Sequence, residues 1–246
     1  MALYPSATLR LLPENRYQPH ITPVLAIWHS AVDAPGPTSL YGYFKREDIT
    51  LESHFFIKND GEVEQYMDTL VRGDANYRAN GFWKAGKYCG AISVETEDDG
   101  DPNRRIWTPA QVQSSIRLGK WIAETHGIPP TLAREWNGTG FGYHTLFPSD
   151  WTNARGKTCP GTIRIPQFRT EILPAIAGNA HTQEESSKVY PLISDVYRLW
   201  RGGDDLAALK DPKGLEFWLR HGDAVGERQL YIDLTGAFAA AAGFKP

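Results

Sequence analysis

Apolar residues in the first hundred positions form short runs that are typical of buried β-strands. Residues 23–29 (PVLAIWH) are apolar up to a final histidine, and residues 89–96 (CGAISVET) are rich in small and β-branched side chains. Residues 53–67 contain two more runs, which flank Asn59-Asp60-Gly61, a strong signal for a β-hairpin. Glycine and proline punctuate residues 33–50, which predicts a loop with room for one helical turn.

The clearest helix is predicted at residues 108–126. Thr108 can cap its N-terminus, a proline occupies the first helical position, and Gln111 completes a capping box. Apolar residues then recur on one face, and Gly127 with two nearby prolines ends the helix. Residues 163–176 predict an irregular turn followed by a second helix. This order of elements predicts an α/β fold with a mixed central β-sheet flanked by helices.

A change of composition predicts how the chain is divided. Residues 179–187 are mostly small and polar, which indicates a linker. It would join a domain at residues 1–178 to a small helical C-terminal region at residues 188–246. Helical spacing of apolar residues in that region predicts helices at 188–202, 212–222 and 224–243.

The charge balance argues against a nucleic-acid partner. The chain has 26 basic and 29 acidic residues, a net charge of −3, and no basic run. Because an electrostatic grip on nucleic acid needs a basic face, no such partner is expected. No segment approaches the ~20 apolar residues needed to cross a membrane, and the N-terminal segment lacks the pattern of a secretory signal. We therefore expect synthesis in the cytoplasm and no membrane insertion.

The two cysteines suggest different roles. Cys89 lies within a predicted strand and is interpreted as a small buried hydrophobic residue. A disulfide with Cys159 is not favoured, since structural disulfides are rare in a reducing compartment. Cys159 lies in the sequence RGKTCPG and could be a buried thiol or a metal ligand. A His/His/Cys set would hold zinc and leave a position for water, with His29 and His144 as candidates, but spacing alone does not select them.

Four stretches, taken in order, resemble the type 2 N-acetylmuramoyl-L-alanine amidase family, which includes phage endolysins and peptidoglycan recognition proteins. They are VLAIWHS, SHFFIKNDGEVEQY, GAISVETEDDG and GYHTLFPSDWTNARGKTCPG. The resemblance spans residues 20–176, is greatest to endolysins of phages that infect actinobacteria, and has K-x-C-P-G as its most specific motif. It implies an amidase-like fold with a metal in a groove on one face.

The resemblance also implies a ligand set. One Zn²⁺ would be held by His29, His144 and Cys159, and nitrogen with thiolate donors suits this ion. Such an ion supplies a nucleophile by lowering the pKa of water towards ~7 and polarises the scissile carbonyl. Lys157, two residues before the cysteine, is expected to stabilise the tetrahedral oxyanion as a positioned cation.

A general base is needed to move the proton from water to the leaving amine. Members of the family use one of two residues as this base. One is a glutamate on the strand that matches GAISVET, where Glu95 stands, and the other is a tyrosine just before the histidine that matches His54. Ser53 stands at the place of that tyrosine, so Glu95 is the expected base. Glu97, which a strand period of two places on the same face, is the alternative for the base or a supporting role.

The substrate-binding predictions depend on loops. Glycine-containing segments at residues 74–81 and 135–140 are expected to rim the cleft, because binding residues tend to lie on loops. His54 matches a family histidine that is not a metal ligand, and it would line the pocket or serve the structure. The residues predicted to contact substrate are His54, Asn76, Tyr77 and Trp83.

The resemblance implies hydrolysis of the amide between N-acetylmuramic acid and L-alanine in peptidoglycan. The predicted protein is a phage endolysin that accumulates in the host cytoplasm and reaches the cell wall when a holin opens the membrane. A prophage or bacterial amidase is an alternative origin. A non-catalytic peptidoglycan-binding module is the alternative function. The region 188–246 could bind the wall, form a homo-oligomer or pack as a helical cap.

Overall fold

The computed structural model describes residues 1–13, 17–32, 39–147, 149–153 and 155–178. The side chains of residues 149 and 150 are not described. The predicted linker at 179–187 and the predicted helices of 188–246 lie outside the described residues, so both stay predictions. No helix in the described ranges combines the length and the apolar character that crossing a membrane requires.

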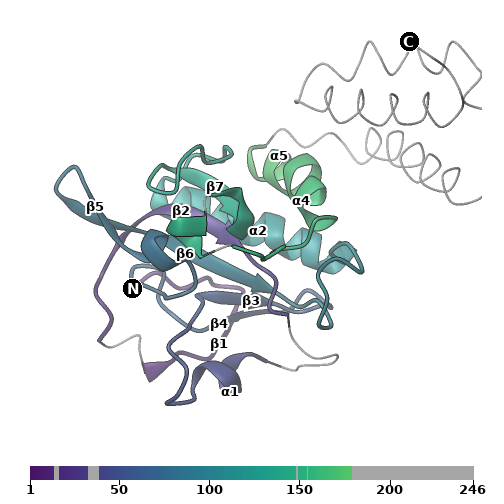
Figure 1. Cartoon of the computed structure of the whole chain (residues 1–246), viewed down its shortest axis with the longest axis horizontal. Coiled ribbons are helices and arrows are strands. Elements are labelled where there is room, and N and C mark those ends of the chain that lie inside the picture. The colour runs from purple at the N-terminus through teal and green to yellow at the C-terminus, as the bar shows by residue number, and fades with distance from the viewer. Residues whose placement is uncertain (14–16, 33–38, 148, 154, 179–246) are drawn as a thin grey trace, which may run out of the picture. The chain divides into compact units, whose positions relative to one another are not determined.

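A mixed sheet of seven strands forms the centre of the described part (Figure 1). Its order is β1-β4-β3-β6-β2-β7, and β5 pairs with β6 beside this path. The strands β3, β6, β2 and β7 run parallel to one another, while β3 and β4 form the antiparallel hairpin predicted around Asn59-Asp60-Gly61, and β5 is antiparallel to β6. The bounds are β1 Thr8–Leu9, β2 Thr22–Trp28, β3 Phe55–Ile57, β4 Val63–Gln65, β5 Phe82–Lys84, β6 Lys87–Thr96 and β7 Gly140–Tyr143.

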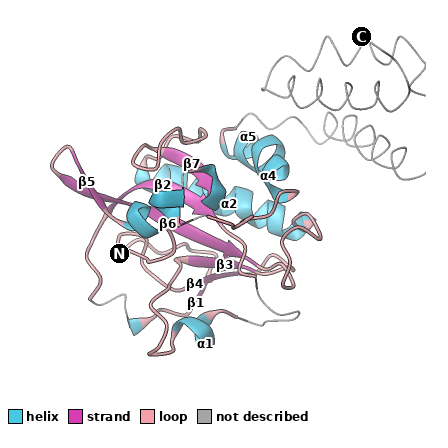
Figure 2. Ribbon diagram, in the orientation of Figure 1, coloured by secondary structure: helices cyan, strands magenta, loops and turns pink. Residues whose placement is uncertain are grey.

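Helices pack against the sheet, and short helical turns lie within the loops that connect its strands (Figure 2). The long helix α2 is accompanied by a continuous helical segment made of α4, η4 and α5. Four short helical elements, α1, η2, η3 and α3, complete the described helices. The bounds are α1 Tyr41–Phe44, η2 Tyr77–Asn80, α2 Pro109–His126, η3 His144–Leu146, α3 Ser149–Thr152, α4 Arg164–Gln167, η4 Phe168–Ile172 and α5 Leu173–Ile176.

Helix α2 begins and ends as its sequence predicts. The hydroxyl of Thr108 accepts a hydrogen bond from the backbone N–H of Gln111 at 3.1 Å, and the Gln111 side chain accepts one from the N–H of Thr108 at 3.0 Å. These two bonds satisfy backbone donors that a helix start leaves free. Gly127 ends the helix in the left-handed conformation with φ 65°. The sheet and the helices that flank it confirm the predicted fold class.

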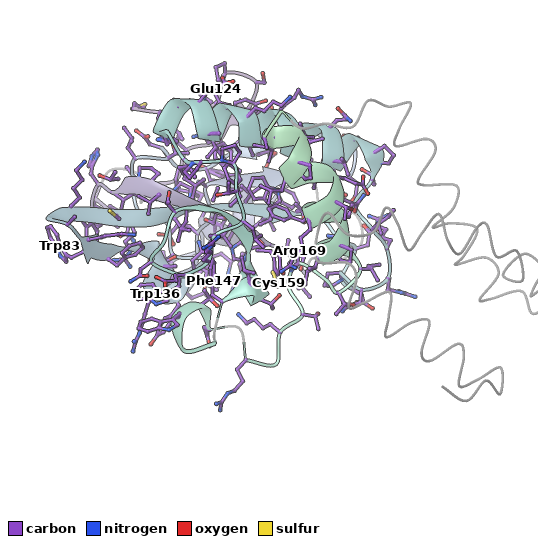
Figure 3. The ribbon with its side chains drawn as sticks, turned by 90° about the horizontal axis from the view of Figure 1, so that it is seen from above. Trp83, Glu124, Trp136, Phe147, Cys159 and Arg169 are labelled. Atoms are coloured by element: carbon purple, nitrogen blue, oxygen red, sulfur yellow. The ribbon has the colours of Figure 1, made fainter. Side chains whose placement is uncertain are left out.

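The sheet separates two hydrophobic clusters. On one face, Val112, Leu118 and Ile122 of α2 pack in a cluster with Trp28 and Val94. Alternate residues of the same strands face the opposite side, since side chains alternate along a strand. That second cluster contains Leu25, Ile27, Ala79, Phe82, Cys89, Ala91, Ala133 and Phe147. Figure 3 shows Glu124 of α2 on one side of the sheet and Trp136, Phe147 and Cys159 on the other.

Two segments differ from their predictions. The strand predicted at 89–96 begins at Lys87, where a tight turn joins it to β5, which the apolar pattern does not reveal because β5 is short and largely exposed. The segment predicted as a turn and a helix at 163–176 is helical from Arg164 to Ile176, with a π-helical turn in its middle.

Candidate metal centre and groove

Three parallel strands end together at one edge of the sheet. The last residues of β2 and β7 are paired in register, so the residues that follow them, His29 and His144, are neighbours. On the other side of β2, the N–H of His29 donates to the carbonyl of Val94 in β6 at 2.8 Å. The next residue of β6 is Glu95. The sheet therefore places Glu95, His29 and His144 side by side.

The two imidazole rings present the same nitrogen to each other. The Nδ1 atoms of His29 and His144 are 3.1 Å apart. The other nitrogen, Nε2, lies 2.8 Å from Asn76 Oδ1 in His29 and 2.5 Å from the carbonyl oxygen of Thr152 in His144. Because a carbonyl oxygen only accepts hydrogen bonds, each Nε2 is assigned the proton and each Nδ1 a lone pair.

The segment that contains Cys159 completes the cluster. Its Sγ lies 3.8 Å from Nδ1 of His29 and accepts a hydrogen bond from the N–H of Ser30 at 3.2 Å. The carbonyl of Cys159 accepts from the N–H and the hydroxyl of Thr145, at 3.2 and 2.8 Å. Each histidine is thus followed directly by a residue that fixes the cysteine, and all three side chains are buried.

The donor set fits a zinc ion. The ligand atoms of His29, His144 and Cys159 lie within 4.8 Å of one another. Tetrahedral zinc, with bonds of about 2.0–2.1 Å to nitrogen and about 2.3 Å to sulfur, separates its ligand atoms by about 3.3–3.6 Å. The observed 3.1 and 3.8 Å are close to these values. Two lone pairs that face each other across 3.1 Å repel, and a cation between them removes that repulsion.

Burial sets the protonation of these groups. It lowers the pKa of His29 well below the usual value, and the neighbouring His144 lowers it further. Burial likewise lowers the pKa of His144 to about 4. Burial raises the pKa of the Cys159 thiol to about 12, with the carboxylate of Glu95 adding to the effect. The histidines are therefore neutral at pH 7, which is the form that binds metal, whereas the thiol must lose its proton to become a ligand.

The two candidate bases differ in their surroundings. Oε1 of Glu95 lies 3.9 Å from Nδ1 of His29, and its side chain is 14% exposed, so water can reach it beside the cluster. Strand β6 ends one residue later, at Thr96. The carboxylate of Glu97 accepts a hydrogen bond from the backbone N–H of Asn59 at 2.6 Å, which ties it to the hairpin turn. The geometry favours Glu95 for proton transfer.

An open groove with a volume of about 550 Å³ borders the cluster. Its lining includes His144, Thr152 and the exposed Lys157. The charge of Lys157 contributes to the low pKa of His29 and of His144, so the ammonium acts on the cluster electrostatically. Lys157 therefore stands at the place where a cation could stabilise charge that develops on a bound substrate.

The residues predicted to contact substrate have separate locations. Tyr77 is exposed and lines the groove, whereas Asn76 is buried and bonds to His29 instead. Trp83 is 75% exposed near the tip of the β5 hairpin, away from Cys159 in Figure 3. His54 is fully buried, and its pKa is lowered to about 4 by that burial. Its ring is within hydrogen-bonding distance of the Ser93 hydroxyl (3.1 Å) and the Val71 carbonyl (2.8 Å), which favours the structural role.

Sequence reasoning missed the polar residues that fix the backbone carbonyl of His29 by hydrogen bonds. The hydroxyl of Thr96 lies 2.7 Å from the carbonyl oxygen of His29. The same hydroxyl accepts hydrogen bonds from the Trp107 indole at 2.8 Å and from the buried Arg164 guanidinium at 3.3 Å. With two donors directed at this oxygen, its own hydrogen points to His29. Thr96 was visible beside Glu95 in the predicted strand, but Trp107 and Arg164 carry no local signal for this role.

The two cysteines are free thiols. Cys89 is buried in the second hydrophobic cluster, as its position in a strand predicts. It therefore lies among apolar side chains, whereas Cys159 lies among the histidines.

Residues 22–162 match the N-acetylmuramoyl-L-alanine amidase family. The chain belongs to this family. The match covers more than half of the sequence and includes His29, His144 and Cys159. None of the curated proteins that were compared matches the chain.

Solved structures align with this chain, and the structure of PlyL shares its fold. The structure of PlyL aligns with a TM-score of 0.51 and 13% identity, over 71% of this amidase-family chain and 99% of PlyL. The amidase LysC from Clostridium intestinale URNW aligns at 18% identity over 63% of this chain and 85% of its own, with a TM-score of 0.43. The Drosophila peptidoglycan recognition protein SD aligns at 12% identity over 62% and 83%, with a TM-score of 0.44.

Proposed function

We propose that this protein hydrolyses the amide bond between N-acetylmuramic acid and the L-alanine of the stem peptide, with one Zn²⁺ held by His29, His144 and Cys159. The observation that carries the proposal is the convergence of two Nδ1 lone pairs and one Sγ beside an open groove. Membership of the amidase family supports the reaction class.

A bound zinc would supply Lewis acidity, which activates water and polarises the amide carbonyl. The chain's own groups would manage the proton and the charge. Glu95 takes the proton of the attacking water as the new C–O bond forms, and it returns a proton to the alanine nitrogen as the C–N bond breaks. Lys157 stabilises the negative charge on the carbonyl oxygen before the C–N bond breaks.

The proposal includes a biological setting for this activity. We place the protein as a phage endolysin that is made in the host cytoplasm and gains access to the cell wall through a holin-dependent opening of the membrane. A prophage or bacterial amidase would carry out the same chemistry. Expression of the protein in the host with and without a holin tests holin dependence, since a holin-dependent endolysin lyses the culture only when both are present.

The reaction is tested with a soluble N-acetylmuramyl peptide and liquid chromatography of the products. The protein is assayed as purified, after removal of metal with a chelator, and after addition of Zn²⁺. We expect activity that is lost on chelation and restored by zinc. Cys159→Ala should remove it, whereas Cys89→Ala is a matched control, because this second buried thiol lies in the apolar cluster on β6.

The second candidate is a non-catalytic peptidoglycan-binding module. One of the solved structures that align with this chain is a peptidoglycan recognition protein, whose name describes recognition. For such a module, Cys159→Ala and chelation would leave binding to purified cell walls unchanged, and no new amino group would form under any of the three metal conditions.

A further inference from the structure

The groove beside the metal cluster is cationic, although the whole chain carries a net charge of −3. Of the described residues that line it, Arg72, Arg78 and Lys157 are basic and Asp74 alone is acidic. The guanidinium of Arg72 pairs with Asp74. Among the residues that the structure describes, no carboxylate pairs with Arg78 or Lys157. Lys157 is already assigned to the reaction centre, which leaves Arg78 as a cation available to a ligand.

Aromatic rings hold Arg78 in place. The guanidinium carbon lies 4.8 Å from the ring centroid of Trp151 and 5.8 Å from that of Tyr77. Trp151 in turn stacks on Trp136, with centroids 4.0 Å apart and an angle of 11° between the rings. Contacts of this kind engage the flat face of a guanidinium and leave its N–H edge free. A guanidinium edge that is held in this way, and that has no carboxylate partner among the described residues, suits bidentate binding of a carboxylate.

The turn that carries Arg78 is anchored to the metal cluster. Asn76, which directly precedes this turn, is the residue that accepts the hydrogen bond from His29. The N–H of Asn76 donates to the side chain of Asn80 at the end of the turn, at 2.5 Å. Tyr77 adopts φ 50°, a left-handed conformation that costs energy in a residue with a side chain and that tends to occur at functional sites. The position of Arg78 is therefore fixed relative to the reaction centre.

The chemistry of the proposed substrate identifies the partner. Both backbone ends of the L-alanine lie in amide bonds and its side chain is a methyl group, so this residue carries no charge. The nearest ionisable group of the stem peptide is on the second residue, D-isoglutamate, whose α-carboxylate is either free or amidated. We propose that Arg78 determines specificity by binding this carboxylate, so that the protein prefers stems with a free acid to amidated stems. This inference rests on the proposed function.

The test compares two soluble substrates that differ only in that group: N-acetylmuramyl-L-alanyl-D-isoglutamate and the D-isoglutamine form. We expect wild-type kcat/KM to be about tenfold higher for the acid, a difference typical of one charge-assisted contact. Arg78→Gln should remove the preference by lowering kcat/KM for the acid alone, while Arg78→Lys should keep part of it. Arg46→Gln is a matched control, because this arginine also lies over a tyrosine ring, at 6.0 Å, but outside the groove lining.

The outcomes separate the inference from the proposed function. Equal wild-type rates on both substrates, or an equal loss on both in Arg78→Gln, would overturn the role of Arg78 and leave the amidase intact. If wild type cleaves neither compound, the proposed function fails, and the same two compounds are compared by equilibrium binding. A preference for the acid that disappears in Arg78→Gln supports the carboxylate contact there, and equal affinity overturns it.

Discussion

Asn76 offers the sharpest perturbation of the candidate metal centre. Its side-chain oxygen lies 2.8 Å from Nε2 of His29, and the residue is 1% exposed. We expect Asn76→Leu, a change of similar volume, to leave that nitrogen without an acceptor. An unsatisfied buried donor costs about 1–3 kcal/mol. The imidazole of His29 can avoid this cost by moving its proton to Nδ1, where Nδ1 of His144 is only 3.1 Å away.

After this change of tautomer, Nδ1 of His29 would carry the proton and Nδ1 of His144 would accept a hydrogen bond from it. Neither nitrogen would then offer a free lone pair to zinc. Loss of a partner that orients a metal-binding histidine commonly lowers metal affinity by about 10–100-fold, and we expect Asn76→Leu to fall in this range. Asn76→Asp keeps the acceptor and adds a negative charge, so it should bind zinc at least as tightly as wild type. Zinc affinity is measured by competition with a chromophoric chelator, and circular dichroism verifies the fold. Unchanged zinc affinity in a folded Asn76→Leu variant would refute the role assigned to Asn76.

Three further predictions concern the same cluster. Because the histidines are neutral and the pKa of the Cys159 thiol is raised to about 12, zinc binding near pH 7 should release one proton. The zinc affinity should then increase about tenfold for each unit by which the pH is raised. Calorimetry in buffers of different ionisation enthalpy measures the number of protons released, and a value of zero or two would contradict the prediction. Thr96→Val should weaken Co²⁺ binding about tenfold and alter the visible spectrum of the Co²⁺ form, because the His29 carbonyl loses its donor. Thr96→Ser keeps the hydroxyl and should restore both the affinity and the spectrum. An unaltered spectrum in Thr96→Val excludes the positioning role of Thr96. Glu95→Gln should lower kcat about 10²–10⁴-fold with zinc retained, whereas Glu97→Gln should mainly lower the melting temperature. Steady-state kinetics in which Glu97→Gln loses kcat and Glu95→Gln keeps it would make Glu97 the base.

The sheet edge could be predicted from the sequence, since its geometry follows from strand order. The apolar run before His29 and the glycine-flanked strand before His144 mark two strand ends. Parallel strands place such ends at a common edge, and this brings the two residues together. The third member, Cys159, was selected only by the motif around it. It follows the short helix α3 and a loop, whose path the apolar pattern does not specify.

The supports of the cluster could not be predicted in the same way. Asn76 was expected to contact substrate, yet the loop before η2 turns its side chain to His29. Arg164 reaches Thr96 only because the chain after Cys159 folds back across the end of β6. Contacts of this kind depend on loop conformations and on pairs of residues that are distant in the sequence. Neither leaves a periodic pattern that a sequence analysis can detect.

The most direct test of the account is mass spectrometry of the products formed from purified peptidoglycan by the zinc-loaded protein, with Cys159→Ala and the chelated protein alongside. The account predicts stem peptides with a new free N-terminal L-alanine, intact glycan strands, and no such peptides from either comparison sample. Peptidoglycan that is bound but uncut by the zinc-loaded protein would contradict the amidase, and so would equal release of stem peptides by Cys159→Ala.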